Sequence, residues 1–174
     1  MSHIMVDVEA DGPIPGDYSM VCFGAIVVEP SLGKTFYGKL KPISEEWIPE
    51  ALAVSGFTRE ETLAFDDPKA VMEQFASWIT ASSNGRPFFI SDNNGFDWQF
   101  SNWYFHHFLG ANPFGYSSTN FGSLYRVMGR YEEALALLER AREIRENNLG
   151  EYHVGSAETI NEIAAVWAHE RRLE

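Results

Sequence analysis

The sequence contains a single cysteine, few basic residues and no long hydrophobic run. Because Cys22 has no partner in the chain, neither an intramolecular disulfide nor a thiolate zinc site can form, and we expect a buried, inert thiol in a reducing compartment. The longest apolar run, Met20 to Val28, is about half of the ~20 residues that a helix needs to cross a bilayer. Met1-Ser2-His3 is not the basic start of a signal peptide. We therefore expect a soluble, cytoplasmic protein with no membrane partner.

The shortage of basic residues also limits the partners of the chain. Its 13 Lys and Arg stand against 25 Asp and Glu, which gives a net charge of −12. Such a chain is poorly suited to non-specific nucleic-acid binding through broad neutralisation of phosphates. Metal-assisted chemistry on phosphates stays open, because clustered carboxylates bind divalent cations and these supply the missing positive charge.

The composition describes a globular protein in two parts. With 174 residues, 45% hydrophobic and 14% aromatic, the chain can bury a sizeable core. No Lys follows Lys69, no Asp follows Asp97 and no Pro follows Pro113, so the last third is rich in Glu, Arg, Ala and Leu, which favour helix. We divide the chain into an α/β part at 1–118 and a helical part at 119–174 that packs on it, because the polar joint between them is too short for a free linker.

Hydrophobic periodicity predicts a mixed α/β layout in the first part. The expected elements are strands at 3–9, 20–29, 34–41 and 86–91, a turn at 30–33, and helices at 67–82 and 96–109. Asp67 and Pro68 are a good N-cap and first residue for the helix at 67–82, whose inner face is predicted to carry Val71, Phe75, Trp78 and Ile79.

Two carboxylates in the first strand are candidate metal ligands. Asp7 and Glu9 are two residues apart, so their side chains leave one face of the strand about 7 Å apart and can share a pair of metal ions. Acidic pairs at this spacing are also common on the solvated face of a half-buried strand. The apolar residues around the pair and the Gly12-Pro13 loop after it favour the end of a central strand, where α/β folds place their sites.

A third candidate lies in the segment that follows the strand at 86–91. Asp97 falls in the first turn of the aromatic helix, where the helix dipole stabilises a charged carboxylate. The alternative is an ordinary first-turn Asp. Most aromatic residues of this helix are expected in the core, but one exposed ring beside the carboxylates can stack on a terminal base.

Together these elements resemble the DEDD exonucleases, in which Asp-x-Glu on the first strand and an Asp in an Asn-x-x-Asp segment hold two divalent metals. The likeness is closest to the bacterial 3'-5' exoribonuclease-like branch and covers about residues 3–125. The segments that carry it are 6–13, 18–20, 48–52, 65–68 and 89–93. The resemblance implies a ribonuclease-H-like fold, a mixed sheet flanked by helices.

The resemblance also implies an activity: removal of nucleotides from the 3' end of single-stranded RNA or DNA with two Mg²⁺ or Mn²⁺ ions. The implied metal ligands are Asp7, Glu9, Asp97 and Glu158. The implied catalytic residues are Glu9 and His153, and His153 would be the general base. The implied substrate contacts are Gly12, Met20 and Phe96. The family carries an Asp five residues after its late His, and here Glu158 takes that place. The longer arm changes the reach of the carboxylate, and a displacement of about 1 Å can cost roughly a hundredfold in rate.

A second resemblance covers the helical part. The segment from Gly122 to Ile144 resembles a tetratricopeptide repeat of the kinesin-light-chain type. Trp167 occupies the position equivalent to Tyr125 in what resembles the start of a second repeat. That branch often has a His near the position of His153, so this residue has two explanations. One repeat and a fraction cannot bury its own apolar face, so the segment must pack on the first part or on another chain. A natural fusion or an engineered chimera explains the joint.

Two functions follow from the sequence. One is a two-metal exonuclease; the other is a catalytically impaired or inactive exonuclease-like scaffold whose helices bind a protein partner or a second copy. The exonuclease resemblance implies a homodimer, which the helical segment can create, block or replace. No motif distinguishes RNA from DNA, because that choice depends on contacts with the 2'-hydroxyl.

Overall fold

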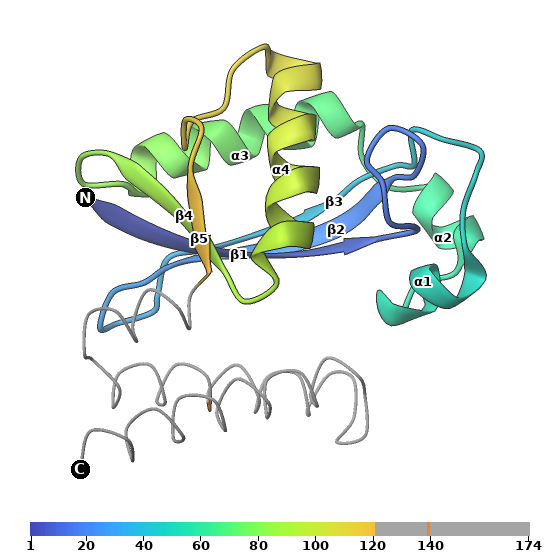
Figure 1. Ribbon diagram of the computed structural model, residues 1–174, viewed down its shortest axis with the longest axis horizontal. Helices are drawn as coiled ribbons and strands as arrows, with labels where there is room; N and C mark the ends of the chain where they lie inside the picture. The colour runs from blue at the N-terminus through green and yellow to red at the C-terminus, as the bar shows by residue number, and fades with distance from the viewer. Residues whose placement is uncertain (121–138, 140–174) are drawn as a thin grey trace. The chain divides into compact units, whose positions relative to one another are not determined.

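The computed structural model describes residues 1–120 and Glu139 (Figure 1). The chain divides into two compact units, Met1–Thr119 and Asn120–Glu174. His153, Glu158 and the helices expected after residue 120 lie outside the described residues, and the packing of the second part on the first stays a prediction. Among the residues that are described, no helix has the length and apolar character needed to cross a membrane.

A five-stranded mixed sheet forms the centre of the first unit, with the strand order β3-β2-β1-β4-β5. β1 pairs antiparallel with β2 and parallel with β4, and β2 pairs antiparallel with β3. The elements are β1 (Ser2–Ala10), β2 (Met20–Val27), β3 (Thr35–Lys39), α1 (Pro49–Val54), α2 (Arg59–Leu63), α3 (Pro68–Ser82), β4 (Pro87–Ser91), α4 (Asn94–Leu109) and β5 (Ser118–Asn120). Figure 1 shows α3 and α4 on one face of the sheet and α1 and α2 beyond one end of it. This is the α/β layout that the periodicity predicts.

The alternation in β1 separates a core face from a polar face. Ile4, Val6 and Val8 are at most 3% exposed and face the helices, whereas Asp7 and Glu9 are only half-buried on the opposite face. β1 is also the central strand of the five, as the sequence predicts. The candidate ligands of the first strand therefore stand at the middle of the sheet.

Aromatic rings fill the space between the sheet and its helices. Phe75 of α3 is the hub, and its ring contacts five others at centroid distances of 4.6 to 6.3 Å. These are Phe23, Phe36, Trp78, Phe105 and Phe114. The N-terminus of α3 is as predicted: the Asp67 carboxylate accepts a hydrogen bond from the Ala70 N–H at 3.0 Å, and Pro68 is the first helical residue. Val71, Phe75 and Ile79 are buried and Trp78 is partly buried.

The structure differs from the sequence prediction in several places, one of which is β5, a strand in the segment expected to be a polar joint. α4 begins at Asn94, two residues before the predicted start, and β2 ends at Val27, so the hairpin connection is longer than the turn predicted at 30–33. α1 and α2 were not predicted, because helices of six and five residues are too short to show a period of 3.6. The capping box formed by Thr58 and Glu61 is the signal that marks α2.

The loop from β1 to β2 is fixed by a buried carboxylate. Asp11 is fully buried; its carboxylate accepts hydrogen bonds from the Ser19 N–H and, at 2.7 Å, from the Arg59 guanidinium. Burial raises the pKa of Asp11, although the Ser19 hydrogen bond and the Arg59 charge oppose the shift. The Asp11 carbonyl also accepts from the Ile48 N–H at 2.8 Å. The loop that follows the candidate ligands is therefore anchored to the segment before α1 and to α2.

The aromatic core generates the first prediction. Phe75→Ala should lower the free energy of unfolding of the first unit by about 3–5 kcal/mol, because it empties the centre of the ring cluster. Urea denaturation followed by circular dichroism measures this change. Tyr116→Ala is the matched control: Tyr116 is 89% exposed, and its loss should cost no more than about 0.5 kcal/mol. Equal effects of the two substitutions would contradict the assignment of Phe75 as the hub.

Candidate metal centre

The site begins where two parallel strands separate. The pairing of β1 with β4 runs from Ser2 and Pro87 to Met5 and Ile90 and then stops, while β1 continues to Ala10. The first turn of α4 follows β4 closely in the chain and supplies the next partner for β1. The Val8 N–H donates to the Asp97 Oδ1 at 3.0 Å, so a side chain takes the place of the missing strand carbonyl.

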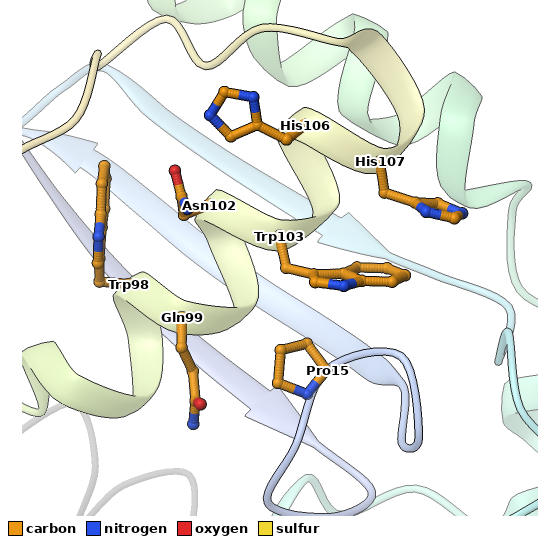
Figure 2. Close-up of a pocket in the computed structure, with 7 residues that line it drawn as sticks. All are labelled: Pro15, Trp98, Gln99, Asn102, Trp103, His106 and His107. Carbon is orange, nitrogen blue, oxygen red and sulfur yellow. The ribbon is translucent and has the colours of Figure 1, made fainter.

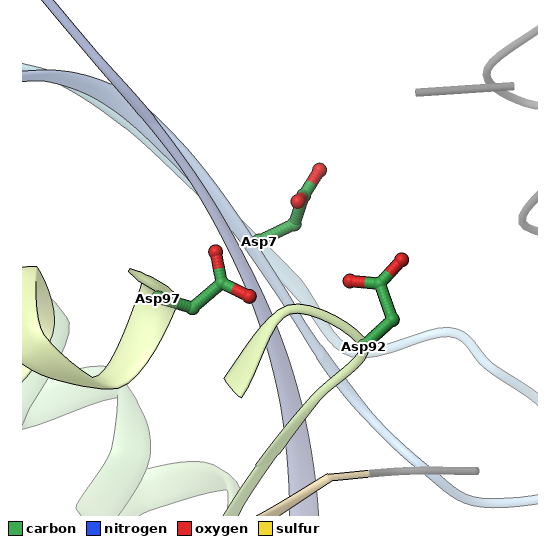
Figure 3. Close-up of side chains that lie close together, drawn as sticks. All are labelled: Asp7, Asp92 and Asp97. Atoms are coloured by element: carbon green, nitrogen blue, oxygen red, sulfur yellow. The ribbon is translucent and has the colours of Figure 1, made fainter. Parts of the chain in front are cut away.

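Three carboxylates converge at this point. Asp7 comes from β1, Asp92 follows the last residue of β4, and Asp97 lies in the first turn of α4. One oxygen of each lies within 4.8 Å of the other two, and Figure 3 shows the three side chains projecting into the same space. Three elements of the fold therefore each supply one potential oxygen ligand.

Asp97 is the most constrained of the three. It is 1% exposed, and burial, followed by the negative charges of Asp7 and Asp92, raises its pKa well above the usual range of an Asp. Its Oδ2 is buried and accepts no hydrogen bond within the part of the chain that the structure describes. A buried carboxylate oxygen without a donor is unfavourable unless a cation lies beside it.

These residues fit a divalent cation. Carboxylate oxygens are the ligands that Mg²⁺ and Mn²⁺ prefer, and within residues 1–120 the Asp97 Oδ2 accepts no hydrogen bond. Asp7, Asp92 and Asp97 therefore form a candidate metal site. A candidate metal site agrees with the metal chemistry expected from the sequence; the cluster contains Asp7 and Asp97 of the four expected ligands and adds Asp92.

The structure brings Asp7 and Asp97 together, as the sequence analysis expects, and adds Asp92. Glu9 is on the same face of β1 as Asp7, opposite Cys22 in the strand register, and is not one of the three converging carboxylates. Its role as a ligand stays a prediction. Sequence reasoning missed Asp92, although it is the first charged residue after a strand that runs parallel to β1, so the two strands end at the same edge.

The three expected substrate contacts have different surroundings. Gly12 is buried under the Tyr18 ring, where a Cβ would lie 2.2 Å from ring carbons, so only glycine fits. Met20 is 1% exposed and its N–H donates to the Tyr104 hydroxyl at 2.8 Å, which places it in the core. Phe96 is partly buried against Phe100, with a ring-centroid distance of 5.0 Å. Contact of substrate with these residues stays a prediction.

The single cysteine is buried, as predicted. It lies on β2 beside Tyr37 of β3, and burial raises the pKa of the Cys22 thiol to about 11. The negative charges of Glu9 and Asp7 contribute to the same shift. The thiol is therefore protonated at neutral pH and unreactive.

An open groove runs along the exposed side of α4 (Figure 2). It has no Asp, Glu, Lys or Arg in its lining, which consists of Pro15, Trp98, Gln99, Asn102, Trp103, His106 and His107. The Trp103 ring stacks on the His107 ring at 4.3 Å. None of the three converging carboxylates lines this groove, so it offers no metal ligand beyond its histidines.

Comparison with known proteins identifies relatives of the first unit. The chain is 46% identical over 127 residues to the 3'-5' DNA exonuclease Cap18 of Escherichia coli; the match covers 70% of this chain and 66% of the relative. The fold is similar to that of E. coli exonuclease I in complex with a dT13 oligonucleotide, with a TM-score of 0.58 and 19% identity over 72% of this chain and 29% of that one. Exonuclease I from Methylocaldum szegediense gives a TM-score of 0.58 and 20% identity, with the same coverage. The chain thus spans about two thirds of Cap18 and less than a third of exonuclease I.

A separate match covers the second unit. Residues 116–172 match the tetratricopeptide repeat family, as the sequence of the last third indicates. The mixed sheet, its flanking helices and the exonuclease I likeness confirm the ribonuclease-H-like fold of the first part. The chain therefore belongs to the DEDDh 3'-5' exonucleases, the family of Cap18, and carries a tetratricopeptide-like segment at residues 116–172.

Proposed function

We propose that this protein is a metal-dependent exonuclease that removes nucleotides from the 3' end of single-stranded DNA. The observation that carries the proposal is the buried Asp97 Oδ2, which has no hydrogen-bond partner among the described residues and belongs to a cluster with Asp7 and Asp92. DNA is favoured over RNA because Cap18 is named a DNA exonuclease and exonuclease I binds dT13 and dA16 oligonucleotides. No finding supports the RNA preference of the exoribonuclease-like branch.

The described residues supply part of the binding site for this reaction. Asp7, Asp92 and Asp97 would hold Mg²⁺ or Mn²⁺. Glu9 and Glu158, the latter outside the described residues, would complete a two-ion site. When bound, such ions neutralise the phosphate and lower the pKa of the attacking water. Asp97 is held by the Val8 N–H, so its second oxygen has a fixed direction and needs little reorganisation to bind a cation. His153 would accept the proton of the water.

A second function is favoured by one observation. The tetratricopeptide match at 116–172 includes both His153 and Glu158, the residues that would complete the catalytic set. If those residues serve the repeat instead, the chain is an exonuclease-like scaffold that binds a protein partner or a second copy through its helices. Cleavage assays distinguish the two functions.

The carboxylate cluster predicts a pH-dependent effect of metal on stability. A carboxyl group whose pKa is raised by folding stabilises the fold at low pH, and this contribution is lost as the pH rises through the folded-state pKa. Millimolar Mn²⁺ should therefore raise the melting temperature more at pH 8 than at pH 5, because the metal replaces protons and relieves repulsion among the ionised carboxylates. Differential scanning fluorimetry across this range measures the shift.

Asp97→Asn is the matching substitution. It keeps an acceptor for the Val8 N–H and removes the buried charge, so it should raise the metal-free melting temperature at pH 8 and abolish the Mn²⁺ shift. Asp17→Asn changes an exposed residue and should alter neither. A wild-type melting curve unaffected by Mn²⁺ at both pH values would exclude the metal site.

The activity itself predicts a defined product pattern. In Mn²⁺, a 5'-labelled single-stranded DNA should give a ladder that shortens one nucleotide at a time, and a 3'-labelled strand should release labelled mononucleotide at once. Asp7→Asn and Asp97→Asn should each slow this by at least about a hundredfold, since each removes a ligand of the ions that activate the water. Internal cuts, or turnover in EDTA, would refute the mechanism. RNA of the same sequence measures the substrate preference.

The late motif needs its own test. His153→Ala should lower kcat by about a hundredfold or more if His153 is the general base. Glu158→Asp should change the cleavage rate in one direction or the other. A higher rate would mean that the backbone at 158 lies where the family places it and that the longer Glu side chain slows the reaction. A lower rate would mean that the backbone is displaced and that the longer side chain compensates for the displacement. If neither substitution changes the cleavage rate, His153 and Glu158 belong to the repeat alone.

A further inference from the structure

Gly24 lies at a position whose backbone conformation does not require glycine. It lies within β2, between β1 and β3, and its φ is not in the left-handed region. The register shift between β1 and β2 occurs at Glu9 and Ala10, so Gly24 is not at the bulge. A Cβ added at Gly24 would meet no atom within 4 Å. Glycine inside a strand weakens it, and the usual reason to retain one is close approach of a ligand or another backbone.

The strand register shows what surrounds this space. Asp7 of β1 and Tyr37 of β3 lie directly opposite Gly24 on its two sides. Residues opposite one another point to the same face of a sheet, and this is the face away from α3, since the neighbouring Phe23 packs on Phe75. Two strand spacings separate the backbones of Asp7 and Tyr37 by about 10 Å. An open space therefore adjoins the candidate metal centre, with a carboxylate on one side and an aromatic ring on the other.

Tyr37 is an exposed aromatic residue on the β3 side of this space. The residue is 58% exposed, whereas its hydroxyl interacts with the buried Cys22 thiol of β2. An exposed ring held at its hydroxyl end loses little rotational freedom when it packs against another flat group. Such a ring is a platform for stacking of a nucleic-acid base.

Lys39 adds a positive charge to the same face. In the sheet register Lys39 of β3 lies opposite Cys22 of β2, which lies opposite Glu9 of β1. Lys39 therefore projects from the same face as Tyr37, two residues further along β3. Its Nζ lies 4.5 Å from the Phe57 ring centroid, 5.3 Å from that of Phe65 and 6.0 Å from that of Tyr37. Among the ion pairs of residues 1–120, none includes Lys39. The ammonium group is positioned by aromatic rings and keeps its capacity to bind an anion.

We propose that Gly24, Tyr37 and Lys39 form a binding surface for the DNA strand beside the candidate metal centre. A base stacks on Tyr37 over the space at Gly24, and a backbone phosphate pairs with Lys39. The proposal rests on the proposed function, which places a 3' end at Asp7, Asp92 and Asp97. It explains how a chain with a net charge of −12 holds a polyanion. The metal ions would neutralise the phosphate at the 3' end, and Lys39, whose charge also acts on the Glu61 carboxylate, would neutralise a phosphate further along.

A purely structural role gives different expectations. In that case Lys39 only covers the rings of Phe57 and Phe65, and Tyr37 only covers Cys22. Substitutions would then change the melting temperature and leave DNA affinity unaltered. The two roles are separated by measuring binding, its salt dependence and stability on the same variants.

The test uses the full chain and a 5'-fluorescein-labelled oligothymidylate, with binding followed by anisotropy in Ca²⁺. Lys39→Met keeps most of the stem that packs on the rings and should weaken binding about tenfold. It should also reduce the slope of log Kd against log salt by about 0.7, the value for one phosphate contact on a single strand. Lys39→Arg should retain most of the affinity. Lys69→Met is the control: it removes the same charge from an exposed position on α3 and should change binding by less than twofold.

Gly24→Val fills the space without disturbing the strand. Because its added Cβ meets no atom within 4 Å and valine favours strands, the melting temperature should stay level or rise while DNA binding falls at least tenfold. In Mn²⁺, Lys39→Met should raise KM for single-stranded DNA and leave kcat unchanged, because the contact is distant from the reacting phosphate. These effects would support a binding surface and not a catalytic role.

The outcomes separate this proposal from the proposed function. Wild-type affinity and salt slope in both Lys39→Met and Gly24→Val would overturn the binding surface, even if the protein cleaves DNA. A wild-type protein that binds but does not cleave, with both variants impaired, would support the surface and contradict the exonuclease. A wild-type protein that neither binds nor cleaves single-stranded DNA would overturn both.

Discussion

One hydrogen bond, from the Val8 N–H to the Asp97 carboxylate, determines how the centre of this protein is assembled. β4 stops pairing with β1 at Ile90, and the backbone of β1 beyond that point needs another partner. By supplying it, Asp97 fixes the first turn of α4 against the central strand. One oxygen of the same carboxylate lies within 4.8 Å of an oxygen of Asp7 and of Asp92. The fold and the candidate metal site thus share one side chain, and neither is complete without it.

The two faces of the sheet differ in their electrostatic environment. The face under α3 and α4 is filled with aromatic rings and has a low local dielectric, which is why Asp97 at its edge is costly as an anion. The opposite face carries Asp7, Glu9 and Lys39 at the surface, where water screens them. A cation bound between the three carboxylates stands at the boundary, where it gains most from the buried charge.

Candidate site residues can be predicted from the sequence where they follow from the local residue pattern, and they are missed where they depend on which strands pair. Asp7 and Asp97 are predictable, because one follows from strand alternation and the other from its place in the first turn of a helix. Asp92 becomes a candidate only once β4 is known to lie parallel to β1, which no local pattern states. Met20 is a second case: the family likeness implies a contact with substrate, which stays a prediction, whereas its burial and the hydrogen bond of its N–H to the Tyr104 hydroxyl come from the fold. Contacts made by non-neighbouring segments decide both cases.

The buried Cys22 has a consequence for the study of motion. It is the only cysteine of the chain, and with a pKa of about 11 fewer than roughly one thiol in a thousand is ionised at pH 8. Modification by an alkylating reagent therefore requires that the Tyr37 side chain, which interacts with the thiol, move away or that β2 open locally. The rate of labelling in the native protein thus reports local opening at the β2–β3 pair. No engineered probe is needed for this measurement.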